Sequence, residues 1–281
     1  MRMKPETLSV GLCQLRQTYD YEKNLERSLL MAEEAASRGA EVVVFTEMFF
    51  SPYEPRAISE AAFLTPVALE EMARTATEGN LFIVAGSVPF QEQQGRYLNR
   101  SCVFAPGNGE IYHHDKLHLF DSTPPGGPSM RESGFVRPGN RLGSFSLPWG
   151  AASVIVCYDM RFPQVTQILA DRGVTILFVP AAFSHATGRA HWEMLVRLRA
   201  VELQGFVVGV QPACNPDLRY VPWGHSMAAT PWGEVVVDLG QEEGIEVVSL
   251  DLSDISRLRS QFPLLAHRRT DLYGVNWMEK A

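Results

Sequence analysis

Strand-like and helix-like segments alternate along most of this 281-residue chain, and this alternation constrains the fold more than any other feature. Short β-branched runs separate segments whose apolar residues recur at helical spacing. We expect strands at residues 8–15, 41–45, 81–88, 99–104, 110–114, 153–156, 174–179 and 206–211. The expected helices cover residues 21–38, 66–77, 162–172, 191–204 and 251–261. This order predicts an α/β layered fold with a mixed sheet.

Two further features complete the expected organisation. Residues 224–229, 234–239 and 245–250 are strand-like, and their close spacing predicts an antiparallel run. Residues 120–140 form the longest stretch without a regular pattern, and a loop of that length is more often functional than not. No linker or solenoid-period repeat interrupts the sequence, so we expect one domain over residues 1–281, with its core at about 8–275.

The charge balance and the cysteine pattern narrow the possible functions. With 25 Lys and Arg against 32 Asp and Glu, the net charge of -7 argues against nucleic-acid binding, which needs a basic surface. No run of about 18 apolar residues predicts a membrane span. The opening residues are too polar for a signal peptide. The four cysteines are scattered without a CxxC pair, so we expect a reducing, cytoplasmic location rather than a disulfide framework.

A cysteine stands where a predicted strand turns into a helix. It lies in residues 151–163, Ala-Ala-Ser-Val-Ile-Val-Cys-Tyr-Asp-Met-Arg-Phe-Pro. Pro163 suits the first turn of the helix that follows. A thiol at such a turn is lifted out of the sheet, and the free N–H groups of a helix N-terminus favour its thiolate. Cys157 is therefore a candidate nucleophile. The alternative is that a free cysteine beside Val-Ile-Val is an ordinary small core residue.

Two charged residues also follow apolar strands: Glu47 after Val-Val-Val-Phe-Thr, and Lys116 after His-His-Asp. Strand ends that point the same way in one sheet bring their side chains together, so we expect both residues to meet Cys157. A carboxylate can take the thiol proton, while an ammonium lowers the thiol pKa and stabilises an oxyanion. Taken singly, Glu47 is also explained as a surface or helix-cap carboxylate, and Lys116 as a solvated charge.

Motifs spread over residues 9–273 combine these three residues with further polar and aromatic positions. They are Phe-Thr-Glu47, Asp115-Lys-Leu-His-Leu-Phe120, Cys157-Tyr-Asp-Met-Arg-Phe-Pro163, Thr187-Gly-Arg-Ala-His-Trp-Glu193, Trp223-Gly-His-Ser226, Pro231-Trp-Gly233 and His267-Arg-Arg-Thr-Asp-Leu-Tyr273. These motifs, and the spacings of 69 and 41 residues along Glu47, Lys116 and Cys157, resemble the carbon–nitrogen hydrolase (nitrilase) superfamily. Members of that superfamily use a Glu–Lys–Cys triad.

The resemblance implies a role for each of five residues. Glu47 would be the general base, Lys116 the oxyanion stabiliser and proton donor, and Cys157 the nucleophile. The N–H of Tyr158 would be a second oxyanion donor, and Glu132 would hold the lysine and help orient the substrate. The implied fold is a four-layer αββα sandwich that forms a face-to-face homodimer. The implied reaction hydrolyses a small amide through a thioester, releases ammonia and needs no metal or other cofactor.

Two groups within the superfamily are similar to this chain. Ser51-Pro52-Tyr53 and Trp223-Gly-His-Ser226 resemble omega-amidases, which hydrolyse the terminal amide of 2-oxoglutaramate or 2-oxosuccinamate. The cysteine motif and the His267-to-Tyr273 ending are shared with deaminated-glutathione amidases. Glu54 replaces a glycine, and Arg189 replaces a proline, of the omega-amidase pattern. N-carbamoyl amino acids, aliphatic amides and nitriles therefore stay open as substrates.

The substrate pocket is expected on aromatic and polar residues near these motifs, namely Tyr53, Phe183, Thr187 and Arg189. Three arginines have the chemistry to hold a substrate carboxylate by paired hydrogen bonds, namely Arg161, Arg189 and Arg197. The sequence does not select among the three.

Two other classes of function stay open. His113, His114, Asp115 and His118 carry metal-ligating groups, and His114 and His118 have the spacing of a helix-borne metal pair. The segment is expected to be strand running into loop, however, and structural histidines explain it as well. A non-catalytic binding protein is the other class, because layered α/β folds host many functions. The presence of all three triad residues favours the enzyme.

Overall fold

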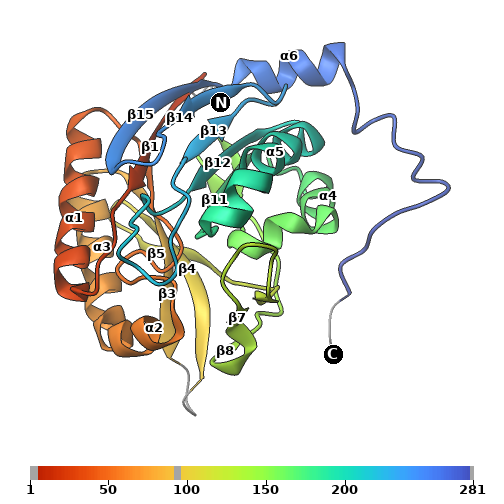
Figure 1. The fold of residues 1–281 in the computed structure, drawn as a ribbon. Helices are drawn as coiled ribbons and strands as arrows, with labels where there is room; N and C mark the ends of the chain where they lie inside the picture. Colours follow the sequence, from red (N-terminus) through yellow and green to blue (C-terminus); the bar gives the residue numbers. More distant parts are fainter. Residues whose placement is uncertain (1–5, 92–95, 279–281) are drawn as a thin grey trace.

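The computed structural model describes residues 6–91 and 96–278. Most of its strands form a seven-stranded sheet and a six-stranded sheet that pack face to face, and helices cover the outer faces (Figure 1). The layers are therefore α, β, β and α, as the family resemblance implied. No helix in the described ranges is long and apolar enough to cross a bilayer.

The seven-stranded sheet has the order β15-β1-β2-β3-β4-β5, and β8 pairs with β4. Its strands are β1 (Thr7–Gln14), β2 (Val42–Val44), β3 (Phe82–Gln91), β4 (Tyr97–Ala105), β5 (Gly109–Asp115), β8 (Val136–Arg137) and β15 (Gly244–Asp251). β1, β2 and β3 are parallel, whereas β4 and β5 are each antiparallel to the strand before. The helices of this half are α1 (Tyr21–Ser37), α2 (Pro55–Ala61) and α3 (Thr65–Glu78), with the short 3-10 helix η1 (Ala62–Leu64) between the last two.

The six-stranded sheet has the order β14-β13-β12-β11-β10-β9. Its strands are β9 (Phe145–Leu147), β10 (Gly150–Val154), β11 (Ile176–Pro180), β12 (Phe206–Val210), β13 (Met227–Ala229) and β14 (Val235–Asp238). The helices of this half are α4 (Pro163–Asp171), α5 (His185–Leu203) and α6 (Ser253–Gln261), and the turn after β10 is the 3-10 helix η3 (Cys157–Arg161). β6 (Asp121–Ser122), β7 (Met130–Arg131) and η2 (Glu132–Gly134) lie in the segment between the sheets.

Three apolar layers hold the sandwich together. The central layer joins the facing sides of the two sheets and contains Leu12, Val44, Val154, Phe178 and Val208, all fully buried. The outer layers lie between each sheet and its helices. Because β2, β11 and β12 are covered on both faces, they consist of nearly continuous apolar residues instead of alternating ones. Each such side chain contributes about 1.5–3 kcal/mol when it is fully buried.

The pairing of β15 differs from the predicted antiparallel run of three neighbouring strands. The predicted antiparallel run is right for β13 and β14, which pair with each other. β15 instead crosses to the other sheet and pairs antiparallel with β1 over its whole length, from Thr7 opposite Asp251 to Gln14 opposite Gly244. Its side chains alternate between two apolar layers: Ile245 and Val247 pack towards the helices, and Leu250 packs between the sheets.

Helix α5 begins at residue 185 rather than at 191, because two features favour an earlier start. Ser184 caps the helix, and its Oγ accepts the backbone N–H of Thr187 at 3.4 Å. Gly188, which interrupts the apolar pattern in the sequence, is required by packing: a Cβ there would lie 2.2 Å from Cβ of Trp223. Residues 187–189 therefore belong to the helix and not to a loop.

Several shorter elements were not predicted. α2, which begins with Pro55 at a position where a missing N–H costs nothing, lies in a stretch expected to be loop. The irregular stretch 120–140 contains the β6–β7 pair, η2 and β8, so the prediction of one long loop was wrong. This stretch supplies Phe120 and Glu132 to the site described below.

Candidate active site

Glu47, Lys116 and Cys157 come together at strand ends from both sheets. Glu47 follows β2 and Lys116 follows β5, so both belong to the seven-stranded sheet. Cys157 follows β10 of the six-stranded sheet. The expectation that one sheet carries all three residues was therefore wrong. The two sheets are joined beside the site by the Thr46 hydroxyl, which donates to the carbonyl of Ala181 at 2.8 Å.

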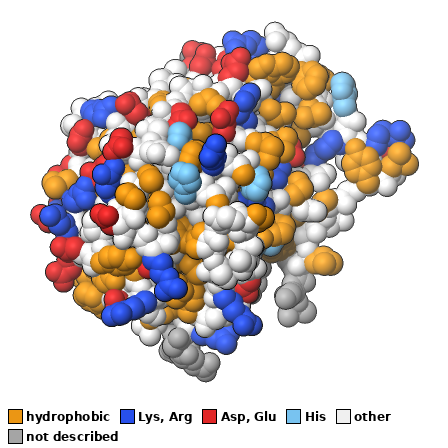
Figure 2. All heavy atoms as spheres, viewed as in Figure 1, with side chains coloured by type: hydrophobic (Ala, Val, Ile, Leu, Met, Phe, Trp, Pro, Cys, Tyr) orange, Lys and Arg blue, Asp and Glu red, His pale blue; other side chains and the backbone are white. Residues whose placement is uncertain are grey.

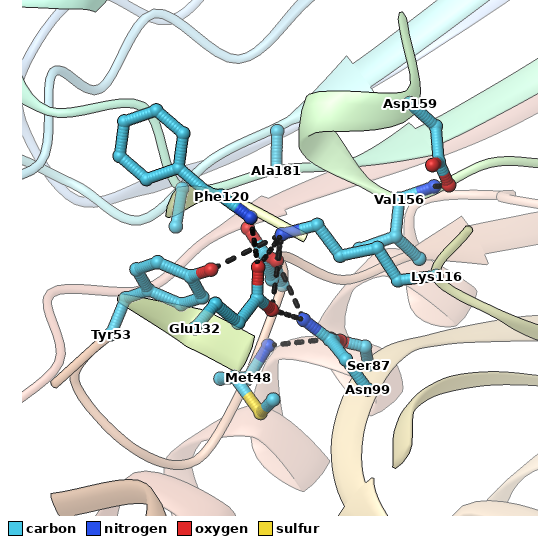
Figure 3. Close-up of polar contacts among 12 residues, drawn as sticks. Met48, Tyr53, Ser87, Asn99, Lys116, Phe120, Glu132, Val156, Asp159 and Ala181 are labelled. Atoms are coloured by element: carbon cyan, nitrogen blue, oxygen red, sulfur yellow. Dashed lines mark hydrogen bonds and ion pairs between the residues drawn. The ribbon is translucent and has the colours of Figure 1, made fainter. Parts of the chain in front are cut away.

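The Lys116 ammonium is fully buried among three oxygen-bearing side chains (Figure 3). Its Nζ lies 2.8 Å from Oε1 of Glu47 and 2.9 Å from Oε2 of Glu132. It also donates to the Tyr53 hydroxyl at 3.1 Å. Nδ2 of Asn99 donates to both carboxylates, at 2.8 and 3.0 Å. One ammonium thus stands between two buried carboxylates, and Asn99 fixes their relative position.

Burial and neighbouring charges shift the pKa values of Glu47 and Lys116 in opposite directions. Burial raises the pKa of Glu47, and the attraction of Lys116 does not fully offset it, so that carboxylate is a stronger base than a free one. Burial alone would lower the pKa of Lys116. The carboxylates of Glu132 and Glu47 outweigh that effect and raise the lysine pKa well above its usual range. The lysine therefore stays charged.

Cys157 sits at the turn after β10 with a positive φ of 47°, which is rare for a residue with a side chain. The turn lifts the thiol out of the sheet, as the sequence suggested. The surroundings, however, do not favour the thiolate form of Cys157. Burial, followed by the negative charge of Glu47, raises the pKa of Cys157 well above its usual range, and Lys116 only partly opposes them. Lys116 lowers the thiol pKa, as expected, but burial, which the sequence does not show, outweighs it.

The carboxylate of Glu47 lies next to this thiol. The carboxylate and the thiol are close enough to shift each other's pKa. Oε1 of Glu47 is already hydrogen-bonded to Lys116 and Asn99, whereas the buried Oε2 has no hydrogen-bond partner in the described part of the chain. Oε2 is therefore the oxygen available to take the thiol proton.

Asp159 is a buried carboxylate to which the motifs alone assign no role. It accepts the backbone N–H groups of Leu117 and His118 at 3.1 and 2.8 Å, and that of Val156 at 3.1 Å. Burial would raise its pKa, but hydrogen bonds from the His114 and His118 side chains outweigh burial and lower it. This carboxylate therefore ties the segment after β5 to the turn after β10, which fixes the lysine relative to the cysteine.

The histidines considered as metal ligands have other partners. Nε2 of His114 lies 3.0 Å from Asp159, and His118 stacks on Phe162 with ring centroids 3.7 Å apart. His113 is bonded to Glu110 at 2.8 Å. Among residues 6–91 and 96–278, no group of three or more His, Cys, Asp or Glu side chains is arranged to hold a metal ion.

A narrow cavity opens beside the cysteine. Its lining residues are Tyr53, Phe120, Cys157, Tyr158, Arg161, Ala182, Phe183, Thr187 and Tyr220. Three of the four predicted pocket residues therefore line it. The fourth, Arg189, is exposed and lines a separate surface depression together with Arg197. The helical start of α5 explains this difference, because positions 187 and 189 point to different faces of a helix.

Arg161 is the arginine of the three candidates that lines the cavity. Its guanidinium carbon lies 4.7 Å from the ring centroid of Phe183 and 5.7 Å from that of Tyr158. Its Nη1 lies 3.2 Å from Nδ1 of His191, and no carboxylate of the described residues pairs with it. Partial burial lowers its pKa from the usual value. A partly desolvated arginine without an anionic partner is suited to bind a carboxylate.

An αββα sandwich with a glutamate, a lysine and a cysteine at its strand ends is the architecture of hydrolases that cleave carbon–nitrogen bonds. The family model described as carbon-nitrogen hydrolase matches residues 9–260, so the chain belongs to this family. Within it, the protein is an amidase similar in sequence to omega-amidases. The predicted fold class and superfamily are thereby confirmed.

Curated relatives match nearly the whole chain. Omega-amidase NIT2 of Mus musculus is 37% identical over 270 residues, which cover 96% of this chain and 98% of the relative. Omega-amidase NIT2 of Danio rerio is 39% identical over 258 residues, covering 92% and 93%.

Solved structures agree in fold. The C. elegans NitFhit protein superposes with a TM-score of 0.92 at 30% identity, covering 99% of this chain and 69% of that one. Saccharomyces cerevisiae Nit3, described as a member of branch 10 of the nitrilase superfamily, gives 0.84 at 28% identity, covering 96% and 99%.

Proposed function

We propose that this amidase hydrolyses the amide of a small, carboxylate-bearing substrate and releases ammonia, in the manner of an omega-amidase. One observation carries the proposal: Arg161 lines the same cavity as Cys157. A substrate whose carboxylate pairs with the guanidinium can present an amide carbon to the sulfur a few bonds away. The relatives named omega-amidase support the same substrate class.

The proposed reaction begins with Glu47 taking the thiol proton as Sγ of Cys157 attacks the amide carbon. The Lys116 ammonium and the N–H of Tyr158 stabilise the negative oxygen of the tetrahedral intermediate. The carbon–nitrogen bond then breaks, and the proton held by Glu47 passes to the nitrogen, which leaves as ammonia. Water, deprotonated by Glu47, attacks the thioester. The carbon–sulfur bond breaks, and the proton returns to the sulfur as the carboxylic acid product leaves.

Glu132 supports this chemistry through its contacts. It holds the lysine at 2.9 Å, and its Oε2 also accepts the backbone N–H of Phe120 at 2.7 Å. Because Phe120 lines the cavity, Glu132 links the position of Lys116 to the position of the substrate.

A panel of substrates tests the proposed function by ammonia release. It compares 2-oxoglutaramate, deaminated glutathione, an N-carbamoyl amino acid, an aliphatic amide without a carboxylate, and a nitrile. The highest kcat/KM is expected for a terminal amide that carries a carboxylate at its far end. A preference for the nitrile or for the neutral amide would overturn the proposal.

Arg161→Gln is expected to raise KM for carboxylate-bearing amides by about 10- to 100-fold, the range expected for a lost hydrogen bond to a charged group. KM for a neutral amide is expected to stay near the wild-type value, because no carboxylate pairs with the guanidinium. Steady-state kinetics with both substrates measure the difference. Arg189→Gln is the matched control and should change neither KM, since Arg189 lies outside the cavity. Equal effects of Arg161→Gln on both substrates would argue against a carboxylate anchor.

We also propose that the protein is a homodimer that buries the outer face of α5. Large apolar side chains are exposed there and on the adjoining turn and helix end, namely Met194, Leu198, Trp232 and Phe262. Figure 2 shows apolar side chains gathered over the upper right of the molecule, where Figure 1 places α5 and α6. A second copy of this chain is the proposed occupant, because an exposed apolar patch of this kind typically marks a protein–protein contact.

Trp232→Glu is expected to shift the protein from dimer to monomer at micromolar concentration, because a charge in an apolar contact is costly to bury. Sedimentation velocity measures the shift. Phe63→Glu is the control, since Phe63 is similarly exposed but lies on η1 in the other half of the sandwich. A monomeric wild-type protein would contradict the dimer.

A cytoplasmic location and a small-molecule partner complete the proposal. All four cysteines are free thiols, which suits a reducing compartment. The net charge of -7 gives no support to a nucleic-acid partner.

A further inference from the structure

Glu54 occupies a helix-capping position but does not cap its helix. It precedes α2 with an extended backbone (φ -135°, ψ 137°), and Pro55 follows as the first helical residue. A side chain at this position ordinarily accepts an N–H of the first helical turn, but that of Glu54 makes no such bond. Its Oε1 instead accepts the Tyr19 hydroxyl at 3.0 Å and the backbone N–H of Tyr220 at 3.0 Å. The carboxylate therefore reaches across to a distant segment.

Tyr220 is a wall of the cavity beside Cys157. Its side chain is buried, and its hydroxyl donates to the carbonyl of Ala182 at 2.8 Å. Its ring contacts that of Tyr53 edge to face, with centroids 5.3 Å apart, and the Tyr53 hydroxyl accepts from Lys116. The place of this ring thus determines how far the cavity extends from the reacting groups.

The segment that carries Tyr220 is attached to the pair formed by Glu54 and Tyr19. The N–H of Tyr220 donates to Glu54, and the preceding N–H, that of Arg219, donates to the Tyr19 hydroxyl at 3.4 Å. Two consecutive backbone groups therefore depend on these two side chains. Without the carboxylate, the Tyr220 N–H loses its acceptor, which disfavours the present position of the ring.

We propose that Glu54 is a positioning residue that fixes Tyr220 in the cavity wall and thereby limits the length of substrate that reaches Cys157. This inference rests on the proposed function, because the limit applies to the amide substrates of that reaction. The limit itself is a property of the cavity, so it can be measured without a substrate.

Alkylation of Cys157 by a short and a long reagent tests the proposal. Wild-type protein, Glu54→Ala and Glu54→Gln are treated with iodoacetamide or N-phenyliodoacetamide, and the Cys157 peptide is quantified by mass spectrometry. Glu54→Ala is expected to raise the long-to-short rate ratio about three- to tenfold, the effect of losing a hydrogen bond or two. Glu54→Gln keeps an acceptor oxygen for both bonds and is expected to preserve the wild-type ratio.

Glu60→Ala is the matched control, because Glu60 accepts the Tyr21 hydroxyl at the same distance of 3.0 Å on the exposed surface. It should leave the ratio unchanged. An unchanged ratio in Glu54→Ala, or an equal change in Glu60→Ala, would overturn the proposal. A change in Glu54→Gln as large as that in Glu54→Ala would also overturn it, since the negative charge would then be responsible. Thermal unfolding of each variant verifies that it is folded before labelling.

Kinetics separate this inference from the proposed function. With carboxylate-bearing amides of increasing length, Glu54→Ala is expected to lower KM for the longest amide relative to the shortest, with little change in kcat for the shortest. If the wild-type protein releases ammonia from none of them, the proposed function fails, and the alkylation ratio still decides the role of Glu54.

Discussion

Replacing Cys157 with alanine is expected to reduce ammonia release by about 10⁴-fold or more, as removal of a nucleophile does in other enzymes. Without the sulfur no thioester forms, and the remaining groups only polarise the amide. The change removes one atom from a nearly buried side chain, so the fold is expected to remain. The measurements are ammonia release at saturating substrate and thermal unfolding of both proteins.

Cys102→Ala is the control for this loss. Cys102 is also buried and free, but it lies within β4 and outside the cavity. The control should keep the wild-type kcat. Activity retained in the Cys157 variant would assign the nucleophile to another residue and would refute the proposed mechanism.

Replacing Lys116 with methionine is expected to destabilise the protein by about 3–5 kcal/mol, the cost of breaking a buried ion pair by removing one partner. Glu47 and Glu132 would remain buried without their cation. Ammonia release should fall as well, because the oxyanion loses its charged donor. Urea unfolding of wild-type and variant protein at neutral pH measures the loss of stability.

The pH dependence of that loss has a definite sign. Burial already holds the pKa of Glu47 above 4.5 in the folded protein, and without Lys116 it rises further because the opposing attraction is gone. When a carboxyl has a higher pKa in the folded protein than in the unfolded chain, the protein loses stability as the pH rises through the folded-state pKa. The variant should therefore regain stability as the pH is lowered from about 8 to about 5, and more steeply than the wild type.

Arg56→Met provides the comparison for an ion pair in solvent. Arg56 and Glu60 pair at 2.6 Å on the surface of α2, where solvent screens the charges. Little change in stability is expected at either pH. A Lys116→Met variant with wild-type stability at both pH values would mean that the lysine does not balance the two carboxylates.

Local sequence patterns predicted most strands and the turn that presents the cysteine. Val42–Val44 is a short buried strand that its β-branched residues predicted, whereas the strand before the cysteine covers Gly150–Val154 rather than the predicted 153–156. The same patterns cannot show which strands are neighbours. Gly244–Asp251 pairs with Thr7–Gln14 from the opposite end of the chain, so no local periodicity predicts it.

The rest of the site depends on contacts between residues distant in sequence. The helical role of Gly188 depends on Trp223, which occupies the space beside it. Asp159 stands two residues after the cysteine, which was a signal in the motif, but its partners Leu117 and His118 lie on another strand end. The pKa of the Cys157 thiol is raised mainly by burial, which the sequence shows only approximately.

The division of the triad between two sheets has a consequence for how the enzyme becomes active as it folds. Before the sheets dock, the half with Cys157 has a thiol without a base, and the half with Glu47 and Lys116 has no nucleophile. Under the proposed mechanism, hydrolysis is therefore expected only after the two sheets have docked through the apolar layer between them. During refolding, the return of ammonia release reports the joining of the two halves, and neither half made alone would hydrolyse an amide.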